Sequence, residues 1–165
     1  MKIEKGFTMV ELMVVVAIMA ILVSLIAPSA FKAIEKGKIS AFMRDYREIK
    51  TAAISYYADT SAWPANNNAS VSLVCNDTVN GWHGPYLEGW PQHNPWKGNY
   101  TWCNDNIGVV ATVGSGERYL EVVNVPSGSA AALDTNLDDG NLATGAVRYS
   151  AGNSTLHALV SADTE

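Results

Sequence analysis

The 165 residues of this chain, with a net charge of −5, leave room for one membrane-spanning segment and one modest domain. Mild acidity of this kind argues against general binding to nucleic acids, which needs an excess of basic side chains. The two cysteines, Cys75 and Cys103, form no Cys-x-x-Cys pair and are too few for a typical zinc site.

A short basic stretch with Lys2 and Lys5 opens the chain and leads into an apolar run over residues 12–31, interrupted by two serines and one proline. A run of about 20 apolar residues is long enough to span a bilayer. A secretory signal peptide and a plain membrane anchor, with the lysines on the cytoplasmic side, both fit these features. Neither explains Glu11 at the leading end of the run, because a carboxylate near lipid is costly without a partner.

Residues 6–11, Gly-Phe-Thr-Met-Val-Glu, and the apolar residues after them resemble the class III signal of type IV pilins and type II secretion pseudopilins. The resemblance implies that a prepilin peptidase cuts between Gly6 and Phe7 and methylates the new amino terminus. Glu11 would then be the fifth residue of the mature chain, the position at which the family has Glu. Pro28 would be the twenty-second, where the family commonly has Pro.

Membership of that family would also imply partners and a location. The protein would sit in the bacterial inner membrane and then polymerise with its own copies through the N-terminal helices, served by an assembly platform and its ATPase. The product would be an extracellular or periplasm-spanning filament. Glu11 would pair with the N-methylated Phe7 of a neighbour, because an unpaired carboxylate in an apolar bundle costs several kcal/mol. Such a pair also fixes the axial register of helices that could otherwise slip.

Apolar residues continue at helical spacing beyond the run, from Phe31 to Tyr57, with charged residues on the other faces. The pattern predicts one helix from Thr8 to about Tyr57, kinked or locally melted at Pro28. It also predicts a division of the chain. The parts are a cleaved leader at 1–6, a membrane-spanning or filament-core helix at 7–31, an amphipathic continuation at 32–58 and a globular head at 59–165.

Residues 59–80 are rich in Asn, Ser and Thr and predict a surface loop, with a short helix or strand near residues 71–74. Prolines and large aromatic residues then crowd residues 84–102, which predicts an ordered loop packed by its aromatic rings. This segment resembles the Gly-Pro-Tyr-Leu … Asp-Pro-Trp-Gly segment of major pseudopilins. Asn94 and Lys97 replace the Asp and the Gly.

Four stretches carry β-branched and aromatic residues between turn signals and predict strands at 100–103, 118–125, 145–150 and 155–161. Short connections favour antiparallel pairing, and residues 126–137 have room for one short helix. The expected fold class is α+β, with a long N-terminal helix packed on a small antiparallel sheet. This is the fold that the resemblance to pilins implies.

Oxygen-bearing side chains gather in one loop near the C-terminus, at Asp134, Asn136, Asp138, Asp139 and Asn141. Carboxylate and amide oxygens are the ligands that calcium prefers, so a calcium site is one interpretation. The spacing departs from an EF-hand, because Gly140 comes one place late and Gly145 stands where a bidentate Glu is needed. The other interpretation is a solvated turn whose carboxylates cap a helix.

No enzyme is predicted. The three histidines, His83, His93 and His157, fall on separate expected segments and suggest no catalytic arrangement. In an exported domain, Cys75 and Cys103 are expected to form one disulfide, worth roughly 3 kcal/mol by loop-entropy reasoning.

These observations predict a structural subunit of a type IV filament. The preferred interpretation is the major pilin of a type IV pilus, because of the two cysteines, the Asn-rich loop and a C-terminal region unlike that of pseudopilins. The major pseudopilin of a type II secretion system is the alternative, favoured by the aromatic segment. A membrane-anchored binding module that never polymerises is the alternative from another class, and it would have no need of Glu11.

Overall fold

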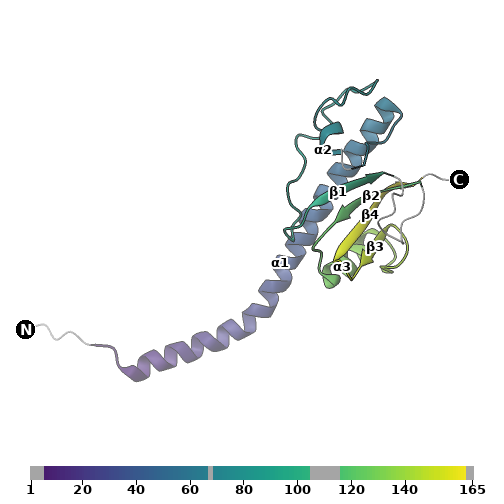
Figure 1. The fold of residues 1–165 in the computed structure, drawn as a ribbon. Coiled ribbons are helices and arrows are strands. Elements are labelled where there is room, and N and C mark those ends of the chain that lie inside the picture. Colours follow the sequence, from purple (N-terminus) through teal and green to yellow (C-terminus); the bar gives the residue numbers. More distant parts are fainter. Residues whose placement is uncertain (1–5, 67–68, 105–115, 163–165) are drawn as a thin grey trace, which may run out of the picture. The chain divides into compact units, whose positions relative to one another are not determined.

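The structure is a computed structural model that describes residues 6–66, 69–104 and 116–162. The chain divides into two compact units, Met1–Gly37 and Lys38–Glu165, and we call the second the head unit. Helix α1 (Met9–Thr60) contributes to both units, and each unit is described by itself (Figure 1). The predicted long helix is thus confirmed, and it ends three residues later than expected, at Thr60.

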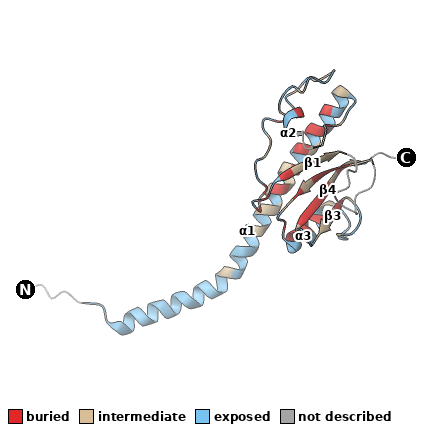
Figure 2. Cartoon of the chain, viewed as in Figure 1, coloured by how far each residue is buried: buried red, intermediate tan, exposed pale blue. Residues whose placement is uncertain are grey.

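In the first unit, α1 is apolar on every side over residues 12–31, and its large apolar side chains are all exposed (Figure 2). Pro28 lies inside the helix, which continues through it without a break, so the predicted local melting is not observed. The two serines of the apolar run bond to their own helix: the Ser24 hydroxyl donates to Ile21 O (2.7 Å) and the Ser29 hydroxyl to Ile26 O (2.8 Å). Neither hydroxyl therefore demands a polar partner outside the helix.

Within the head unit, one stripe of α1 is buried, whereas the charged residues lie on its other faces. The buried residues recur at helical spacing and are Phe42, Tyr46, Ile49, Ala52, Ala53 and Tyr56. The amphipathic second half is therefore confirmed, but the stripe starts later than predicted. Phe31 and Ile34, which helical spacing places on the same stripe, belong to the first unit and are exposed.

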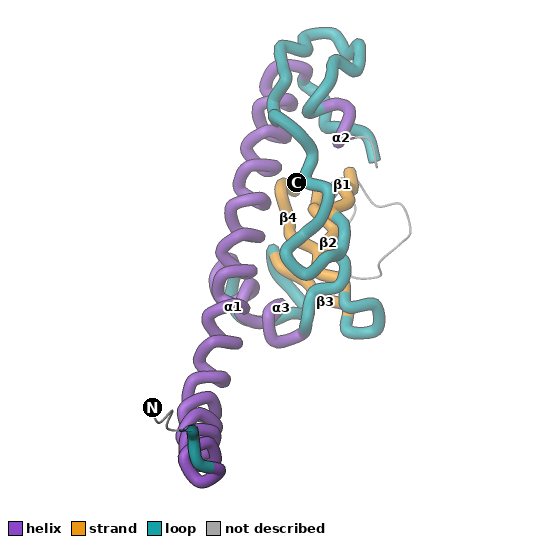
Figure 3. Tube along the Cα trace, turned by 90° about the vertical axis from the view of Figure 1, so that its left-hand side faces the viewer, coloured by secondary structure: helices purple, strands orange, loops and turns teal. Residues whose placement is uncertain are grey.

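The sheet contains four strands, β1 (Tyr100–Asn104), β2 (Glu117–Val122), β3 (Val147–Ser150) and β4 (Thr155–Ala162). Their order is β1-β2-β4-β3 and every neighbouring pair is antiparallel, as predicted. One row of buried side chains crosses all four strands: Trp102 faces Leu120, Leu120 faces Ala158, and Ala158 faces Val147. This row belongs to the same core as the buried stripe of α1, beside which the sheet lies (Figures 1 and 3).

Strand β2 ends at Val122, three residues before its predicted end, because the next residues make loop contacts. Asn124 has φ = 64°, a left-handed conformation that ends the strand. The Val123 carbonyl accepts a hydrogen bond from Asn94 Nδ2 (2.7 Å), and Val125 N donates to Ser154 O (2.9 Å).

The aromatic segment before β1 is ordered, as predicted, and Asn94 organises it. Asn94 is buried, and its Oδ1 accepts from Trp96 N (2.8 Å) and Gly98 N (3.0 Å), while Nδ2 donates to Val123 O. A Cβ on Gly98 would lie 2.1 Å from Val123 O, so a side chain does not fit there. Lys97 has φ = 65°, which explains why a Gly would suit this position in similar segments.

Two short helices complete the head unit, α2 (Ala69–Ser72) and α3 (Ser127–Leu137), in the two regions where short elements were expected. The loop after α2 is tied to it, because Tyr86 N and Leu87 N both donate to Leu73 O (2.8 and 3.0 Å). Helix α3 buries Ala130 and Leu133 in the common core.

Candidate functional site

The start of α1 is closed by reciprocal hydrogen bonds between Thr8 and Glu11. Thr8 N and Thr8 Oγ1 both donate to Glu11 Oε2 (2.8 Å each), and Glu11 N donates to Thr8 Oγ1 (3.2 Å). This is a capping box, in which a Thr before the helix and a Glu three residues later satisfy exposed amide groups. The Thr-x-x-Glu signal is present in the sequence, although the expected helix start rested on hydrophobic spacing alone.

The predicted cleavage position lies just outside this cap. Gly6 and Phe7 precede the helix, and Phe7 is 83% exposed. Among the residues that the structure describes, no atom lies within 4 Å of the point where a Cβ on Gly6 would be. Both residues that flank the predicted cleavage position are therefore exposed.

Behind the cap, the first unit exposes its apolar surface. Leu12 is 57% exposed, and Leu25 and Phe31 are each 72% exposed. By length and composition, α1 contains a segment that could cross a membrane. So much uncovered apolar surface marks a contact with lipid or with other helices.

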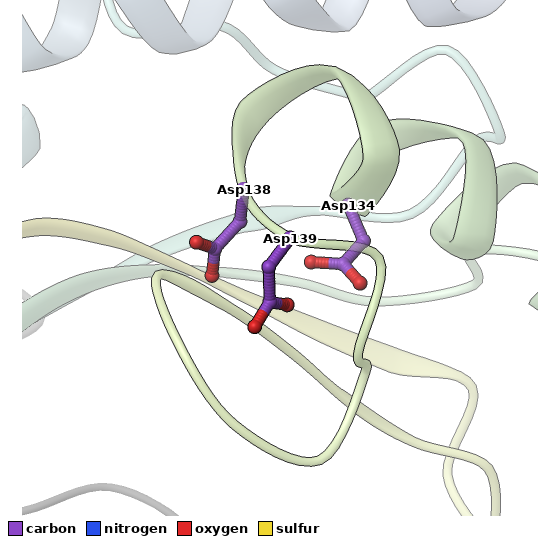
Figure 4. Close-up of side chains that lie close together, drawn as sticks. All are labelled: Asp134, Asp138 and Asp139. Atoms are coloured by element: carbon purple, nitrogen blue, oxygen red, sulfur yellow. The ribbon is translucent and has the colours of Figure 1, made fainter.

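A second candidate site lies where α3 ends. Asp134, Asp138 and Asp139 each place a carboxylate oxygen within 4.8 Å of the others (Figure 4). Asp134 is on the buried side of α3, whereas Asp138 and Asp139 follow the helix and are exposed. In Figure 4 the carboxylate of Asp134 is turned toward the other two.

The loop that leads to β3 orients the two exposed carboxylates. Asp138 Oδ2 accepts a hydrogen bond from Ala146 N, and Asp139 Oδ1 accepts one from Asn141 N (2.9 Å). Gly145 has φ = 83°, and a Cβ there would lie 1.8 Å from Asp138 Oδ2. Only glycine leaves this place open for the Asp138 carboxylate.

Burial of Asp134 has an electrostatic consequence. Its side chain is fully buried, and neither oxygen has a hydrogen-bond partner in the described part of the chain. Loss of hydration raises the pKa of the Asp134 carboxyl above its usual range, and the charges of Asp138 and Asp139 raise it further.

The two amides among the five predicted calcium ligands make local hydrogen bonds, and their part in a site stays a prediction. Asn136 Nδ2 donates to Ala132 O (2.6 Å), one turn back in α3. Asn141 Oδ1 accepts from Ala143 N (3.2 Å), within the loop. Sequence spacing could not give these bonds, because they depend on where α3 ends.

The structure holds Cys75 and Cys103 as free thiols, so the expected disulfide is not formed in it. Cys75 is exposed after α2, whereas Cys103 is half-buried in β1, close to Tyr119. Burial raises the pKa of the Cys103 thiol. Their pairing stays a prediction.

The three histidines are not brought together. His83 and His93 are exposed in loops and bond to Gly81 O (2.7 Å) and Asn99 Oδ1 (3.3 Å). His157 is buried in β4, with its ring edge-on to Tyr119. In the described ranges, the acidic group after α3 is the one cluster of metal-ligating side chains.

Two family models match the N-terminal and the middle part of the chain. Residues 1–27 match the family described as "Prokaryotic N-terminal methylation motif", and residues 33–114 match "PilW, C-terminal". The chain is 35% identical over 80 residues to the fimbrial protein EcpC of Eikenella corrodens, covering 48% of this chain and 50% of that one. It is 34% identical over 74 residues to the type IV major pilin protein PilE1 of Neisseria gonorrhoeae, covering 45% and 35%. The chain thus spans half, or less, of these two relatives.

The match covers more of both chains for a protein of type II secretion. The type II secretion system core protein G of Pseudomonas aeruginosa is 31% identical over 102 residues, which cover 59% of this chain and 71% of that one. Among solved structures, the major type IV pilin PilA1 of Clostridium difficile superposes with a TM-score of 0.51 over 79% of this chain and 98% of that one. At 21% identity, this last likeness concerns the fold alone.

Proposed function

The chain belongs to the family of type IV pilins and type II secretion pseudopilins, and on that premise we propose that it is the major pilin of a type IV pilus. Members of this family are structural, non-enzymatic subunits that polymerise after processing by a prepilin peptidase. The N-terminal apolar helix is consistent with residence in a membrane before assembly and in a filament afterwards.

The observation that carries the proposal is the exposed apolar helix with Glu11 at its start. Within the described part of the first unit, no residue covers the large apolar side chains of residues 12–31. Exposing them to water is unfavourable, so lipid or other helices must surround this helix. A bundle of identical helices supplies such a cover. The bundle leaves Glu11 as a carboxylate in apolar surroundings, which requires a cation.

The N-methylated amino group of Phe7 in a neighbouring subunit is the cation that we assign to Glu11. The capping box supports this assignment, because Thr8 occupies Oε2 alone, and Oε1 accepts no hydrogen bond in the described residues. One oxygen thus fixes the carboxylate on its own helix, and the other is left for a partner. Pro28 also lies in the part of α1 that we expect to pack in the bundle. It has no backbone N–H group, so one hydrogen bond of the helix is missing there.

Processing gives the first test. Cleavage after Gly6 should leave a mature chain that starts with N-methyl-Phe7, measured as the intact mass of the purified subunit. Replacement of Gly6 by a bulky residue should leave uncleaved precursor in the inner membrane. A mature terminus within residues 24–30 would instead indicate an ordinary signal peptide and contradict the proposal.

A major pseudopilin is the second candidate, favoured by the aromatic segment at residues 84–102 and by the 71% coverage of core protein G. The two functions predict different defects when the gene is deleted. Loss of surface filaments, with secretion of exoproteins unchanged, would support the pilin. Loss of secretion without loss of surface filaments would assign the chain to a pseudopilus.

Imaging supplies the direct test. Filaments sheared from the cell surface should contain this chain as their main subunit, identified by mass spectrometry of the same preparation. Their absence under conditions in which the processed subunit accumulates in the membrane would favour the third candidate, an anchored module that does not polymerise.

A further inference from the structure

The basic residues of the head unit are unevenly distributed along the chain. Four of the seven lie on α1 between residues 38 and 50, whereas after α1 ten acidic residues are set against three basic ones. Two of those three already have partners. Arg148 makes two hydrogen bonds to Glu117 (2.7 and 2.8 Å), and Arg118 lies over the ring of Trp63. The positive charge that remains for contacts with other molecules is therefore concentrated on one helix.

Part of this helix forms a groove with the end of α3, and we call it the arginine groove. It has a volume of about 480 Å³. Its lining residues are Ile39, Ser40, Met43, Arg44, Arg47 and Asn136. Ile39 and Met43 are half-buried and give the groove an apolar part, beside which the two arginines supply positive charge. Such a groove suits a carboxylate that is flanked by apolar residues.

The two arginines of the groove are not neutralised within the described part of the chain. Arg47 is exposed, and its guanidinium makes no ion pair or hydrogen bond there. Arg44 is 75% exposed and lies 3.3 Å from Asp45 Oδ1, while the other oxygen of Asp45 accepts from the Tyr100 hydroxyl (3.0 Å). A guanidinium can bind a carboxylate through two parallel hydrogen bonds. The groove therefore has donors left for a carboxylate from another molecule.

A matching carboxylate, that of Glu88, is presented by the loop after α2. Glu88 is exposed and makes no ion pair or hydrogen bond with the described residues. The loop that carries it is fixed, because Tyr86 N and Leu87 N donate to Leu73 O and the Tyr86 hydroxyl donates to Asp59 Oδ2 (2.8 Å). Leu87, next to Glu88, is buried in the core. A carboxylate on a fixed loop loses little freedom when it binds.

Within one chain, Glu88 and the arginine groove lie on different parts of the head unit. The ring of Tyr86 packs edge-on against that of Tyr56, with 5.7 Å between the centroids. Tyr56 is nine residues further along α1 than Arg47, which corresponds to roughly 13 Å. Among the described residues, no ion pair joins Glu88 to an arginine. The two complementary surfaces can therefore meet between copies of the chain.

From this geometry we propose that the arginine groove of one subunit receives Glu88 of the next subunit in the filament, where Arg44 and Arg47 bind its carboxylate. Each such contact leaves one groove and one Glu88 free at the two ends of the assembly. A contact between two different surfaces of identical chains adds further copies instead of closing a dimer. This inference rests on the proposed function, because it requires polymerisation. It adds a contact between head units to the packing of the apolar helices, for a pilus and a pseudopilus alike.

The test is a charge swap in the full-length chain, expressed in cells that assemble the wild-type filament. Arg47→Glu and Glu88→Arg each place like charges together, so each should lower the number of filaments, counted by electron microscopy, by about fivefold or more. The double variant makes the opposite pair and should restore at least half of the wild-type number. Lys97→Glu makes the same charge change as Arg47→Glu at another exposed position and is the matched control. It should assemble like the wild type.

Folding and processing are measured in the same variants. Because both residues are exposed, the unfolding midpoint of the mature subunit in detergent should stay within about 2 °C of the wild type, and the amount of processed subunit should be unchanged. Normal filament numbers from both single variants would overturn the contact. A defect in only one of them, or one that the double variant does not repair, would show that the two residues do not pair. Absence of filaments from the wild type would refute the proposed function and this inference with it.

Discussion

Glu11 illustrates at the scale of one residue how two interactions share a carboxylate. Thr8 binds one oxygen within the subunit, and we propose that the amino group of a neighbour's Phe7 binds the other. The two interactions have different chemical requirements. A cap needs only an oxygen acceptor, which Gln also offers, whereas the pair across subunits needs a negative charge.

Two substitutions therefore separate them. Glu11→Gln keeps the acceptor and loses the charge, and breaking a buried pair costs about 3–5 kcal/mol at every subunit contact. We expect normal cleavage, normal membrane levels and few or no filaments, counted by electron microscopy of sheared material. Thr8→Val removes the cap, at a cost of about 1 kcal/mol, keeps the charge and should still give filaments. Abundant filaments from Glu11→Gln would refute the charge pair.

Tyr46 gives a residue-scale prediction about alkaline pH. Burial raises the pKa of its phenol to about 12, and its hydroxyl donates to Leu159 O in β4. In the unfolded chain the phenol ionises near its ordinary value of about 10. Stability from this residue is thus complete below pH 10 and falls as the pH rises from 10 toward 12, by roughly 2–3 kcal/mol.

Urea unfolding of the mature chain at pH 9, 10 and 11 measures this loss. Tyr46→Phe should be less stable than the wild type at pH 9, because the hydroxyl bond is gone, and should lose less stability between pH 9 and 11. Identical pH profiles for the two proteins would show that Tyr46 does not contribute. Burial also raises the pKa of Tyr56, to about 12, and those of Tyr100 and Tyr119, so these residues contribute to the loss that the variant retains.

At the scale of elements, Asn94 determines how the aromatic segment meets the end of β2. Its amide accepts from Trp96 N and Gly98 N and donates to Val123 O, so it needs both an oxygen and an N–H group. An Asp at this position keeps the acceptor and places a second oxygen against the carbonyl of Val123.

Asn94→Asp should therefore lower the free energy of unfolding by about 1–3 kcal/mol, the typical cost of an unsatisfied buried polar group. Asn99→Asp makes the same chemical change at an exposed position, where the side chain meets His93, and serves as the control. Chemical denaturation of both variants at neutral pH measures the difference. A loss of the same size in both would mean that the added charge, and not the missing donor, is responsible.

For the whole molecule, the state of Cys75 and Cys103 decides whether the head unit carries a covalent link. The structure gives two free thiols, whereas export to an oxidising compartment favours a disulfide. We predict that peptide mapping of filaments without reductant finds the two joined, and that Cys75→Ser lowers stability by up to about 3 kcal/mol. Alkylation of both thiols in untreated filaments would establish the free state instead.

Much of the architecture follows from the sequence, because it depends on residues that are neighbours along the chain. Helical spacing of apolar residues gives α1, and alternation between turn signals gives the four strands, to within a few residues at each end. The Gly-Phe-Thr-Met-Val-Glu motif is itself enough to indicate the family, because its residues are consecutive. Thr8 and Glu11 are also a local signal, since the two residues of a capping box are always three apart.

Tertiary structure alone decided which distant residues meet. Strand order β1-β2-β4-β3 and the bond from Asn94 to Val123 join parts of the chain that no local pattern connects. The acidic loop shows the same division. Its composition predicts oxygen ligands, but only the packing of α3 against the core buries Asp134 without a partner among the described residues. Burial is a property of the whole fold, and the charge that it leaves uncompensated is what separates a candidate metal site from an acidic turn.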